Sequence, residues 1–399
     1  MMDDAILLMR WRDDAGTVRL GAFTGTGERV VPLGAEWTRW EAVQRQCRER
    51  GESLAAWLRP RLASEPAVAV DPAQWILPLE VTEVWAAGVT YEQSRDAREA
   101  ETVSGHDIYA RVYDAPRPEL FWKGAGSHVA GPFEVIGLRP DATWHVPEAE
   151  LTVILDDQGD IWGYTIGNDV TARDLEAENP LYLPQAKLFY HSAAVGPAVA
   201  LAETVDPYAL TITCEIWRHQ QCRWRAQVET RRLRRRIEEL VAWLGRAWPL
   251  APWTAVMTGT GLVPPDDVAL EDGDEVRIGI PPMGVLVNRA RRIDPSWVAV
   301  RKPPPRVVRI DPRDTVAVAL GALEPGHWLS EFGVTVRDPI PFGHKVALTT
   351  MAPGDPVIKY GAQIGVASRA IEPGQHVHTH NVESVRGRGD LVTERSGEA

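Results

Sequence analysis

The chain has 399 residues, of which 44% are apolar and 25% are charged, and its formal net charge is −12. This composition is typical of a soluble protein, and no stretch reaches the roughly 18 uncharged apolar residues of a membrane helix. The negative charge argues against nucleic acid as the main partner, because such binding depends on neutralising phosphates. We therefore expect a soluble protein that binds neither nucleic acid nor a membrane.

Cysteine spacing and the N-terminal residues help to predict the cellular compartment of the protein. The three cysteines, Cys47, Cys214 and Cys222, form no C-x-x-C pair, which argues against a disulfide framework and a zinc site. The opening sequence MMDDAILLMRWRDDAG lacks the basic-then-apolar order of a secretory signal. Both features favour the cytoplasm.

The first three quarters of the chain divide into two predicted domains. Residues 1–75 contain two strand-like stretches, AILLMRW and TVRLGAF, and then a helical stretch, which predict a small accessory domain. Residues 76–298 contain many short apolar runs separated by Gly, Pro and Asp, with helices expected mainly over 91–103 and 231–247. The basic run RRLRRR at 231–236 favours a solvated helix face.

The last hundred residues form a separate region. Three consecutive prolines predict an extended linker over residues 299–306. Residues 307–385 are rich in strand patterns and in Gly and Pro turns, and predict a compact module. The polar residues 386–399 predict a flexible tail.

One strand of the second domain begins with two carboxylates. Alternating apolar residues in VPEAELTVIL (146–155) predict a strand with Glu148 and Glu150 on one face, where they repel each other unless a cation lies between them. A hairpin turning near residues 158–159, in DDQGD, pairs positions whose numbers sum to about 317 and places Asp169 opposite Glu148. Three carboxylates favour Mg²⁺, Mn²⁺ or Ca²⁺. The alternative is two solvent-facing glutamates and a helix-capping aspartate.

Three stretches carry a family resemblance. WHVPEAELTVIL, GYTIGNDVTARDLEAENPLYLPQAK and MTGTGLVPPDDVALEDGDEVRIGI follow one another in an order that resembles the fumarylacetoacetate hydrolase family. The resemblance implies a mixed β/α+β fold with a β-roll core, in which Glu148, Glu150 and Asp169 bind a divalent metal. It further implies a homodimer or higher homo-oligomer and a 2-oxo acid chelated by the metal, which acidifies the substrate at C3.

The expected reaction depends on a segment that is altered here. Hydrolytic members of the family resemble one another in N-Y-x-x-H-x-x-E, whose His and Glu activate water. The corresponding stretch, GVTYEQSRDARE, has Thr90, Ser94 and Ala97 in place of Asn, His and Glu. The stretches VTYEQSRDAREAE, DIYARVYDAPRPELFWK and ENPLYLPQAK instead resemble the 2-dehydro-3-deoxy-D-arabinonate dehydratases. We therefore predict a Mg²⁺-dependent dehydratase of a 2-dehydro-3-deoxy sugar acid, whose C4 hydroxyl leaves to give 2,5-dioxopentanoate in sugar-acid catabolism.

This resemblance assigns candidate roles to five further residues. Lys187 is the candidate proton carrier, and Glu176 would help the hydroxyl depart. Ser94 and Arg95 would contact sugar hydroxyls, and Thr260 would hold the substrate carboxylate. The simpler alternatives are a surface lysine, a salt bridge between Glu176 and a neighbouring arginine, and two ordinary residues at a helix N-terminus.

The neighbours of Lys187 depart from the dehydratase pattern. The chain has K-L-F-Y-H-S where those relatives tend to have K-x-Y-D-G-S, so Phe189, Tyr190 and His191 are altered and the substrate could differ. His191 is either an extra acid–base group or a wall or surface residue. Arg173 is expected to be structural, pairing with Asp174 or another acid.

The C-terminal module resembles a different family. DTVAVALGALEPG, IPFGHKVAL, GDPVIKYGAQIGVAS and IEPGQHVHTHN resemble the SAF-type (β-clip) N-terminal domain of altronate and galactarate dehydratases. Strand alternation places His376, His378 and His380 on one face, with His344 and Lys345 nearby in the motif. This group could bind a metal or a carboxylate, or it could fix turns or an interface.

Two other functions remain open. One is hydrolysis of a C–C bond in a 2,4-dioxo acid, as in fumarylacetoacetate hydrolases and acylpyruvases. The other is a subunit that docks through its SAF-like module onto a separate altronate- or galactarate-type dehydratase chain.

Overall fold

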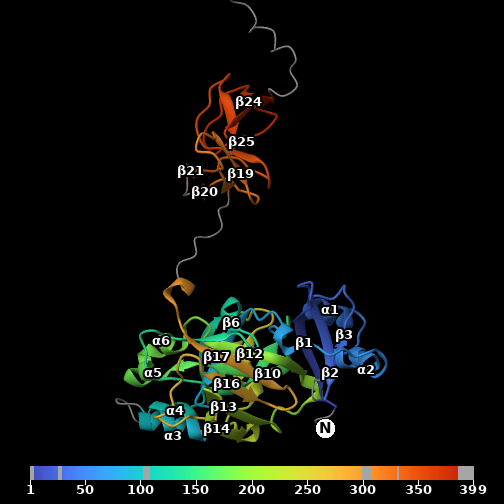
Figure 1. Cartoon of the computed structure of the whole chain (residues 1–399), viewed down its shortest axis with the longest axis vertical. Coiled ribbons are helices and arrows are strands. Elements are labelled where there is room, and N and C mark those ends of the chain that lie inside the picture. The colour runs from blue at the N-terminus through green and yellow to red at the C-terminus, as the bar shows by residue number, and fades with distance from the viewer. Residues whose placement is uncertain (1–3, 26–28, 102–107, 299–306, 330–331, 385–399) are drawn as a thin grey trace, which may run out of the picture. The chain divides into compact units, whose positions relative to one another are not determined.

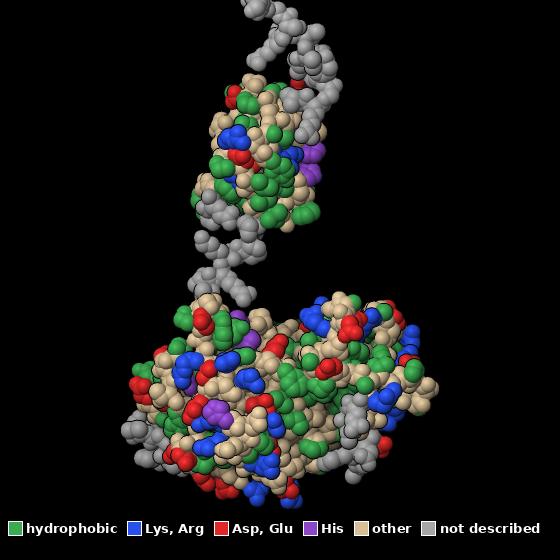
Figure 2. Space-filling view, viewed as in Figure 1, with side chains coloured by type: hydrophobic (Ala, Val, Ile, Leu, Met, Phe, Trp, Pro, Cys, Tyr) green, Lys and Arg blue, Asp and Glu red, His purple; other side chains and the backbone are tan. Residues whose placement is uncertain are grey.

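The protein forms two compact units in the computed structural model, residues 1–299 and 300–399, here called the N-terminal and C-terminal units. The structure describes residues 4–25, 29–101, 108–298, 307–329 and 332–384 (Figure 1). No helix in these ranges has the length and apolar character needed to span a membrane. On the face shown in Figure 2, acidic and basic side chains are interspersed over the N-terminal unit.

A large mixed sheet is the centre of the N-terminal unit. Its strands, in spatial order, are β3 (Val31–Pro32), β2 (Val18–Thr24), β1 (Ile6–Arg12), β12 (Ala193–Leu201), β10 (Ile161–Asp169), β9 (Ala149–Leu155), β15 (Ala255–Met257), β4 (Glu83–Gly88) and β5 (Glu119–Ala125), with β6 (Val129–Ala130) also beside β12. The residues of β9, β10 and β12 are almost all buried. This fits strands that are covered on both faces.

A second sheet packs against the first. Its order is β14 (Gln221–Glu229), β13 (Thr211–Arg218), β16 (Glu275–Gly279), β17 (Val285–Arg292) and β7 (Val135–Leu138), and β8 (His145–Val146) pairs separately with β11 (Thr171–Ala172). One core lies between the sheets, where Leu151 and Val153 of β9 share a cluster with Ile212 and Ile278. A second core contains Ile154 of β9 and residues of α1 (Trp40–Glu49) and α2 (Leu54–Ser64).

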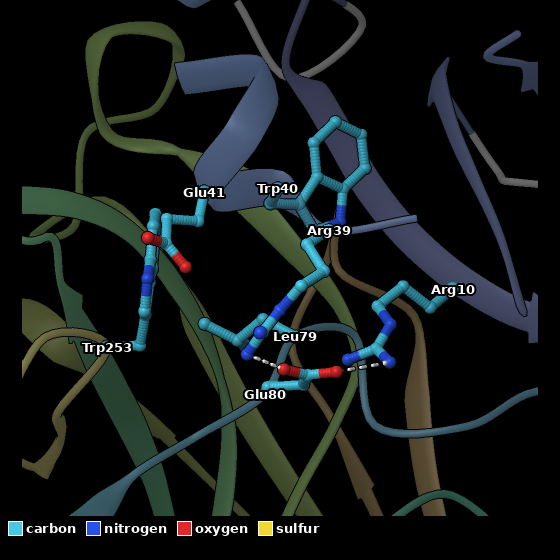
Figure 3. A pocket seen from close by; sticks show the side chains of 7 residues that line it. All are labelled: Arg10, Arg39, Trp40, Glu41, Leu79, Glu80 and Trp253. Atoms are coloured by element: carbon cyan, nitrogen blue, oxygen red, sulfur yellow. Dashed lines mark hydrogen bonds and ion pairs between the residues drawn. The ribbon is translucent and has the colours of Figure 1, made fainter. Parts of the chain in front are cut away.

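The N-terminal strands are continuous with the rest of the unit. Strand β1 pairs antiparallel with β12, with Leu7 opposite Ala200. Glu80, in the segment before β4, forms ion pairs with Arg10 of β1 and with Arg39 at the start of α1 (Figure 3). Residues on both sides of the boundary predicted at residue 75 therefore share one sheet and one compact unit.

The remaining helices of the N-terminal unit are short. They are α3 (Glu92–Glu101), α4 (Ile108–Asp114), α5 (Arg173–Glu178), α6 (Leu183–Lys187) and α7 (Ile237–Leu244), and the 3₁₀ turns are η1 (Pro72–Gln74), η2 (Gly126–His128), η3 (Pro180–Tyr182), η4 (Ala202–Thr204), η5 (Thr230–Arg232) and η6 (Pro295–Trp297).

The prediction of a solvated helix face at residues 231–236 is right about solvation, since Arg231, Arg232, Arg234 and Arg236 are exposed, but wrong about the helix. Helix α7 begins only at Ile237, after this run. Arg235 is buried, and its Nη2 donates hydrogen bonds to the carbonyl oxygens of Val112 and Ala115. The guanidinium satisfies these carbonyls, and this long-range contact is invisible in the local charge pattern.

The C-terminal unit consists of small sheets with cores of their own. The strands are β18 (Val307–Val308), β19 (Val316–Ala319), β22 (Lys345–Ala347) and β25 (His376–Val377) in one sheet, β20 (Trp328–Leu329) and β21 (Val334–Thr335) in a second, and β23 (Pro356–Lys359), β24 (Ala362–Ala367) and β26 (Val382–Ser384) in a third. Ala317 and Val346 belong to one core, and Val316 and Ala347 to another. The predicted linker and tail lie outside the described residues.

Candidate active site

The hairpin of β9 and β10 brings three carboxylates together. Gly167 pairs with Glu150, Asn168 pairs with Ala149, and the Asp169 amide donates to the Glu148 carbonyl oxygen at 3.0 Å. The predicted register is therefore confirmed. Glu148, Glu150 and Asp169 each offer a carboxylate oxygen within 4.8 Å of the others, and their exposed fractions are 6%, 1% and 1%. The alternative of solvent-facing glutamates does not fit this burial.

Three cationic side chains surround the carboxylates. The Lys187 ammonium lies 2.9 Å from Glu148 Oε2 and 2.9 Å from Asp169 Oδ2, and it donates to Thr171 Oγ1 at 2.7 Å. Arg173 Nη2 lies 2.8 Å from Glu148 Oε1. Lys187 is thus buried at the carboxylate cluster and is not a surface lysine.

Lys123 of β5 is the third cation, and sequence reasoning missed it. Its Nζ lies 2.7 Å from Asp169 Oδ1 and donates to the carbonyl oxygens of Val170 and Lys187 at 2.8 and 2.6 Å. Complete burial lowers the pKa of Lys123 to about 8, an effect that Asp169 opposes and the Lys187 ammonium reinforces. The segment ELFWKGA gives no local sign that this lysine is buried.

The carboxylate cluster fits a divalent cation. Burial, followed by repulsion from Asp169 and Glu148, raises the pKa of Glu150 well above its ordinary value. Asp169 Oδ1 accepts no hydrogen bond of good geometry, although Lys123 Nζ is close to it. A set of three carboxylates is the donor chemistry of Mg²⁺ and Ca²⁺, whose charge would relieve the repulsion at Glu150.

A loop after β15 supports Glu150 from the other side. The Gly259 amide donates to Glu150 Oε2 at 2.6 Å. Gly259 has a φ of +93°, and a Cβ built there would lie 1.9 Å from Thr90 Oγ1 and 2.9 Å from the Ala87 carbonyl oxygen. Only glycine fits this close approach, so the loop holds Glu150 through a main-chain donor.

Two of the carboxylates, Glu148 and Asp169, open into a pocket that contains several of the predicted residues. Its empty volume, which includes space open to solvent, is about 370 Å³. The lining residues are Ala87, Gly88, Val89, Ser94, Tyr109, Glu119, Phe121, Glu148, Asp169, Glu176, Leu183, Lys187 and Thr260. Glu119 is a further carboxyl that sequence reasoning missed, because it precedes the apolar residues of β5 without any recognisable motif.

The predicted substrate-binding residues lie in different surroundings. Ser94 is buried, lines the pocket and donates from Oγ to the carbonyl oxygen of Thr260. Arg95 instead forms ion pairs with Asp96 at 2.7 Å and with Glu92 at 3.3 Å, and it is absent from the residues that line the described pocket. The roles of these residues toward substrate remain predictions.

Glu176 and Arg173 form a buried ion pair. Arg173 Nη1 lies 2.5 Å from Glu176 Oε2. Glu176 therefore lines the pocket and also forms the salt bridge with a neighbouring arginine that was the alternative to a catalytic role. The expectation that Arg173 pairs with an acid is confirmed, but its partners are Glu148 and Glu176. Asp174 instead accepts hydrogen bonds from the amides of Thr143 and Trp144.

The altered residues after Lys187 do not line this pocket, although the centroid of the Phe189 ring lies 5.4 Å from the Lys123 ammonium. His191 Nδ1 lies 2.8 Å from the Val135 carbonyl oxygen, and the His191 ring stacks on Tyr190 with centroids 4.0 Å apart. Phe189 contacts His145 edge-on. None of the three altered residues is among the described residues that line the pocket. The structure therefore does not support His191 as a residue of the pocket wall.

Two families match the chain. Residues 83–291 match the family described as fumarylacetoacetate (FAA) hydrolase C-terminal, and residues 305–385 match the altronate/galactarate dehydratase SAF domain. A 2-dehydro-3-deoxy-D-arabinonate dehydratase of Saccharolobus solfataricus is 42% identical over 219 residues, which are 54% of this chain and 74% of that protein. A probable 2-keto-3-deoxyxylonate dehydratase of Haloferax volcanii is 41% identical over 247 residues, which are 60% and 85% of the two chains.

Solved structures agree with these matches. The structure of 2-keto-3-deoxy-D-arabinonate dehydratase complexed with magnesium and 2,5-dioxopentanoate has a TM-score of 0.61 and 33% sequence identity, and the alignment covers 72% of this chain and 99% of that chain. The predicted mixed fold with a C-terminal SAF module is confirmed. The chain belongs to the fumarylacetoacetate hydrolase family and carries a SAF domain at its C-terminal side.

Proposed function

We propose that the protein is a Mg²⁺-dependent hydro-lyase that removes water from a 2-dehydro-3-deoxy sugar acid. Our candidate substrate is 2-dehydro-3-deoxy-D-arabinonate, with 2,5-dioxopentanoate as the product. The main support is one observation: Glu148 and Asp169 of the carboxylate cluster line one pocket together with Lys187 and with further carboxyl and hydroxyl groups. We further propose a cytoplasmic homodimer or higher homo-oligomer, with Mn²⁺ or Ca²⁺ as possible substitutes for Mg²⁺.

Different residues of the pocket can carry out different steps of the reaction. A divalent cation held by Glu148, Glu150 and Asp169 would supply Lewis-acid polarisation of the 2-oxo group. Lys187 lies beside the cluster, and once its ammonium has given up a proton the free amine can accept the C3 proton. General-base catalysis of this kind is worth roughly 10²–10⁴-fold in rate.

Departure of the C4 hydroxyl requires a proton donor. Glu176 is held by Arg173, whose Nη1 lies 2.5 Å from Glu176 Oε2. We therefore give Glu176 the role of accepting a hydrogen bond from a substrate hydroxyl. Glu119 is the other carboxyl of the pocket outside the cluster, and we assign the proton donation to it.

Incubation with 2-dehydro-3-deoxypentonates tests the proposal. With Mg²⁺, we expect mass spectrometry to show the loss of one water and the appearance of 2,5-dioxopentanoate. Removing the divalent cation by chelation should abolish turnover, and Mg²⁺ should restore it. Lys187→Met should lower kcat by about 10²–10⁴-fold, whereas Lys359→Met in the C-terminal unit should leave kcat unchanged.

Three outcomes would contradict the proposal. Failure to release water from any of the pentonates, with metal present, excludes this activity. Pyruvate release from a 2,4-dioxo acid would indicate a C–C hydrolase. Activity found only after a separate dehydratase chain is added would indicate a subunit role.

A further inference from the structure

Four histidine side chains gather at one place in the C-terminal unit. His376 begins β25 and pairs with Val346 of β22, and His344 directly precedes β22. His378 and His380 follow β25. The chain therefore contributes imidazoles from two neighbouring strand ends, and Figure 2 shows histidine side chains together at one edge of this unit. We call these four residues the histidine cluster.

The ring centroids of the histidine cluster are spaced as in a metal site, but the His344 and His378 rings lie parallel, at 7°, and must turn before both can bind one ion. The ring centroids of His344 and His376 are 5.1 Å apart, those of His376 and His380 5.2 Å, those of His376 and His378 5.5 Å, and those of His344 and His378 4.6 Å. A tetrahedral metal with bonds to nitrogen of about 2.0–2.1 Å places the centroids of its imidazole ligands about 5 Å apart. The observed spacings bracket this value.

One pair of ring nitrogens already meets. His344 Nδ1 and His376 Nε2 are 2.9 Å apart, so they share one proton in the absence of a metal. Around a tetrahedral ion with bonds to nitrogen of about 2.0–2.1 Å, the ligand nitrogens lie roughly 3.4 Å apart. An ion bound by this pair would therefore replace the shared proton only after the two rings turn, while the strands stay in place. Among the described residues, three ligand atoms lie within 4.8 Å of one another only in the carboxylate cluster, so the nitrogens of the histidine cluster do not yet converge on one point. His378 and His380 would reach a common ion by rotation of their rings.

The backbone of the histidine cluster is held from within the unit. Asn381 is buried, its Oδ1 accepts from the His378 amide at 2.9 Å, and its Nδ2 donates to the His376 carbonyl oxygen at 2.9 Å. The His376 amide donates to Asp338 Oδ2 at 3.0 Å. These contacts fix the main chain and leave only side-chain torsions free, which lowers the entropy cost of gathering the rings around an ion.

The donor chemistry of the cluster differs from that of the carboxylate cluster. Neutral imidazoles suit Zn²⁺, Cu²⁺ or Ni²⁺, whereas Mg²⁺ and Ca²⁺ prefer oxygen. His380 is exposed and the other three rings are half-buried, so water or a carboxylate can complete the coordination.

We propose that His344, His376, His378 and His380 form a binding site for a divalent transition-metal ion that prefers nitrogen ligands, such as Zn²⁺. The site is distinct from the oxygen-donor site in the N-terminal unit, and its occupation does not depend on the proposed dehydratase activity.

Titration of the full-length, tag-free chain tests the site. The chain carries Glu150→Gln and is kept in excess Mg²⁺, so that the carboxylate cluster does not compete. Calorimetry with Zn²⁺ and visible absorption with Co²⁺ should both show one bound equivalent, and the Co²⁺ spectrum should have the intensity of a low-coordinate nitrogen site. His376→Ala and His344→Ala should each weaken binding by about 100-fold or more, since even residues that only support ligands account for roughly 10–100-fold.

Matched variants keep the test decisive. His327→Ala, also in the C-terminal unit, should leave the affinity unchanged, and circular dichroism checks that each variant is folded. His380→Ala changes an exposed ring and should weaken Zn²⁺ binding without affecting the fold. Absence of a bound equivalent, or binding that survives both His376→Ala and His344→Ala, would overturn the proposal.

Discussion

At the scale of single residues, His145 shows how burial sets a protonation state. It is fully buried in β8, and its Nε2 accepts a hydrogen bond from the Arg139 amide at 2.9 Å. An acceptor nitrogen cannot carry a proton, so the folded protein holds the neutral ring. Burial lowers the pKa of His145 to about 4, and Asp174 opposes this shift only in part.

This shift predicts a loss of stability in acid. Above pH about 6.5 His145 is neutral in both the folded and the unfolded protein and has no effect. As the pH falls from about 6.5 to 4, the unfolded chain binds a proton that the folded chain does not, so the free energy of unfolding should decrease by about 2–3 kcal/mol. Denaturant titrations at several pH values should show this decrease in the wild type.

Two variants separate this residue from other groups that titrate in acid. His145→Gln should remove most of the decrease between pH 7 and 4, because Gln does not titrate. His128→Gln, at an exposed position, should retain it. Equal pH slopes for the wild type and His145→Gln would show that His145 does not contribute.

At the scale of structural elements, the loop after β15 links the sheet to the carboxylate cluster. Gly259 donates its amide to Glu150 and has no room for a Cβ, because Thr90 Oγ1 and the Ala87 carbonyl oxygen are too close. Strand β15 pairs with both β9 and β4, so the loop lies between the strand that carries Glu150 and the strand that leads to Thr90. A shift of this loop would move the Gly259 amide that donates a hydrogen bond to Glu150.

Gly259→Ala should therefore impair the site beyond its effect on the backbone. Gly273 is a matched control, since it also has a positive φ, of +94°, but a Cβ there meets nothing within 4 Å. Both substitutions should cost about 1–3 kcal/mol of stability for the backbone strain. Only Gly259→Ala should also weaken Mg²⁺ binding, by about 10-fold or more. Calorimetric titration measures it, and equal Mg²⁺ affinities in the two variants would contradict the expectation.

At the scale of the whole molecule, the two units have separate hydrophobic cores. Val153 belongs to a core of the N-terminal unit and Val346 to a core of the C-terminal unit, and both are completely buried. Because each core is formed by residues of one unit, we expect the units to unfold in two transitions during calorimetry of the full chain.

A pair of valine substitutions tests this expectation. Val153→Ala should lower the midpoint of one transition and Val346→Ala the midpoint of the other, each with a loss of about 1–3 kcal/mol. Val346→Ala should leave the dehydratase activity intact. A single transition that both substitutions lower equally would mean that the units unfold cooperatively.

Local patterns in the sequence were enough for the carboxylate cluster. The alternation in VPEAELTVIL and the turn in DDQGD determine a hairpin, and a hairpin determines that Glu148 and Asp169 lie opposite each other. The four imidazoles of the C-terminal unit also follow from short motifs, and the structure brings them together as neighbouring rings.

Only the tertiary structure decided the rest. Lys123, Glu119 and Gly259 come from other strands and loops, and the order of the large sheet brings them to the hairpin. Likewise, β1 lies beside β12 although nearly two hundred residues separate Leu7 from Ala200. Short-range spacing determines which residues share a face within one element. Which element fills the neighbouring place in a sheet depends on the packing of the complete core, and no single stretch of the sequence contains that information.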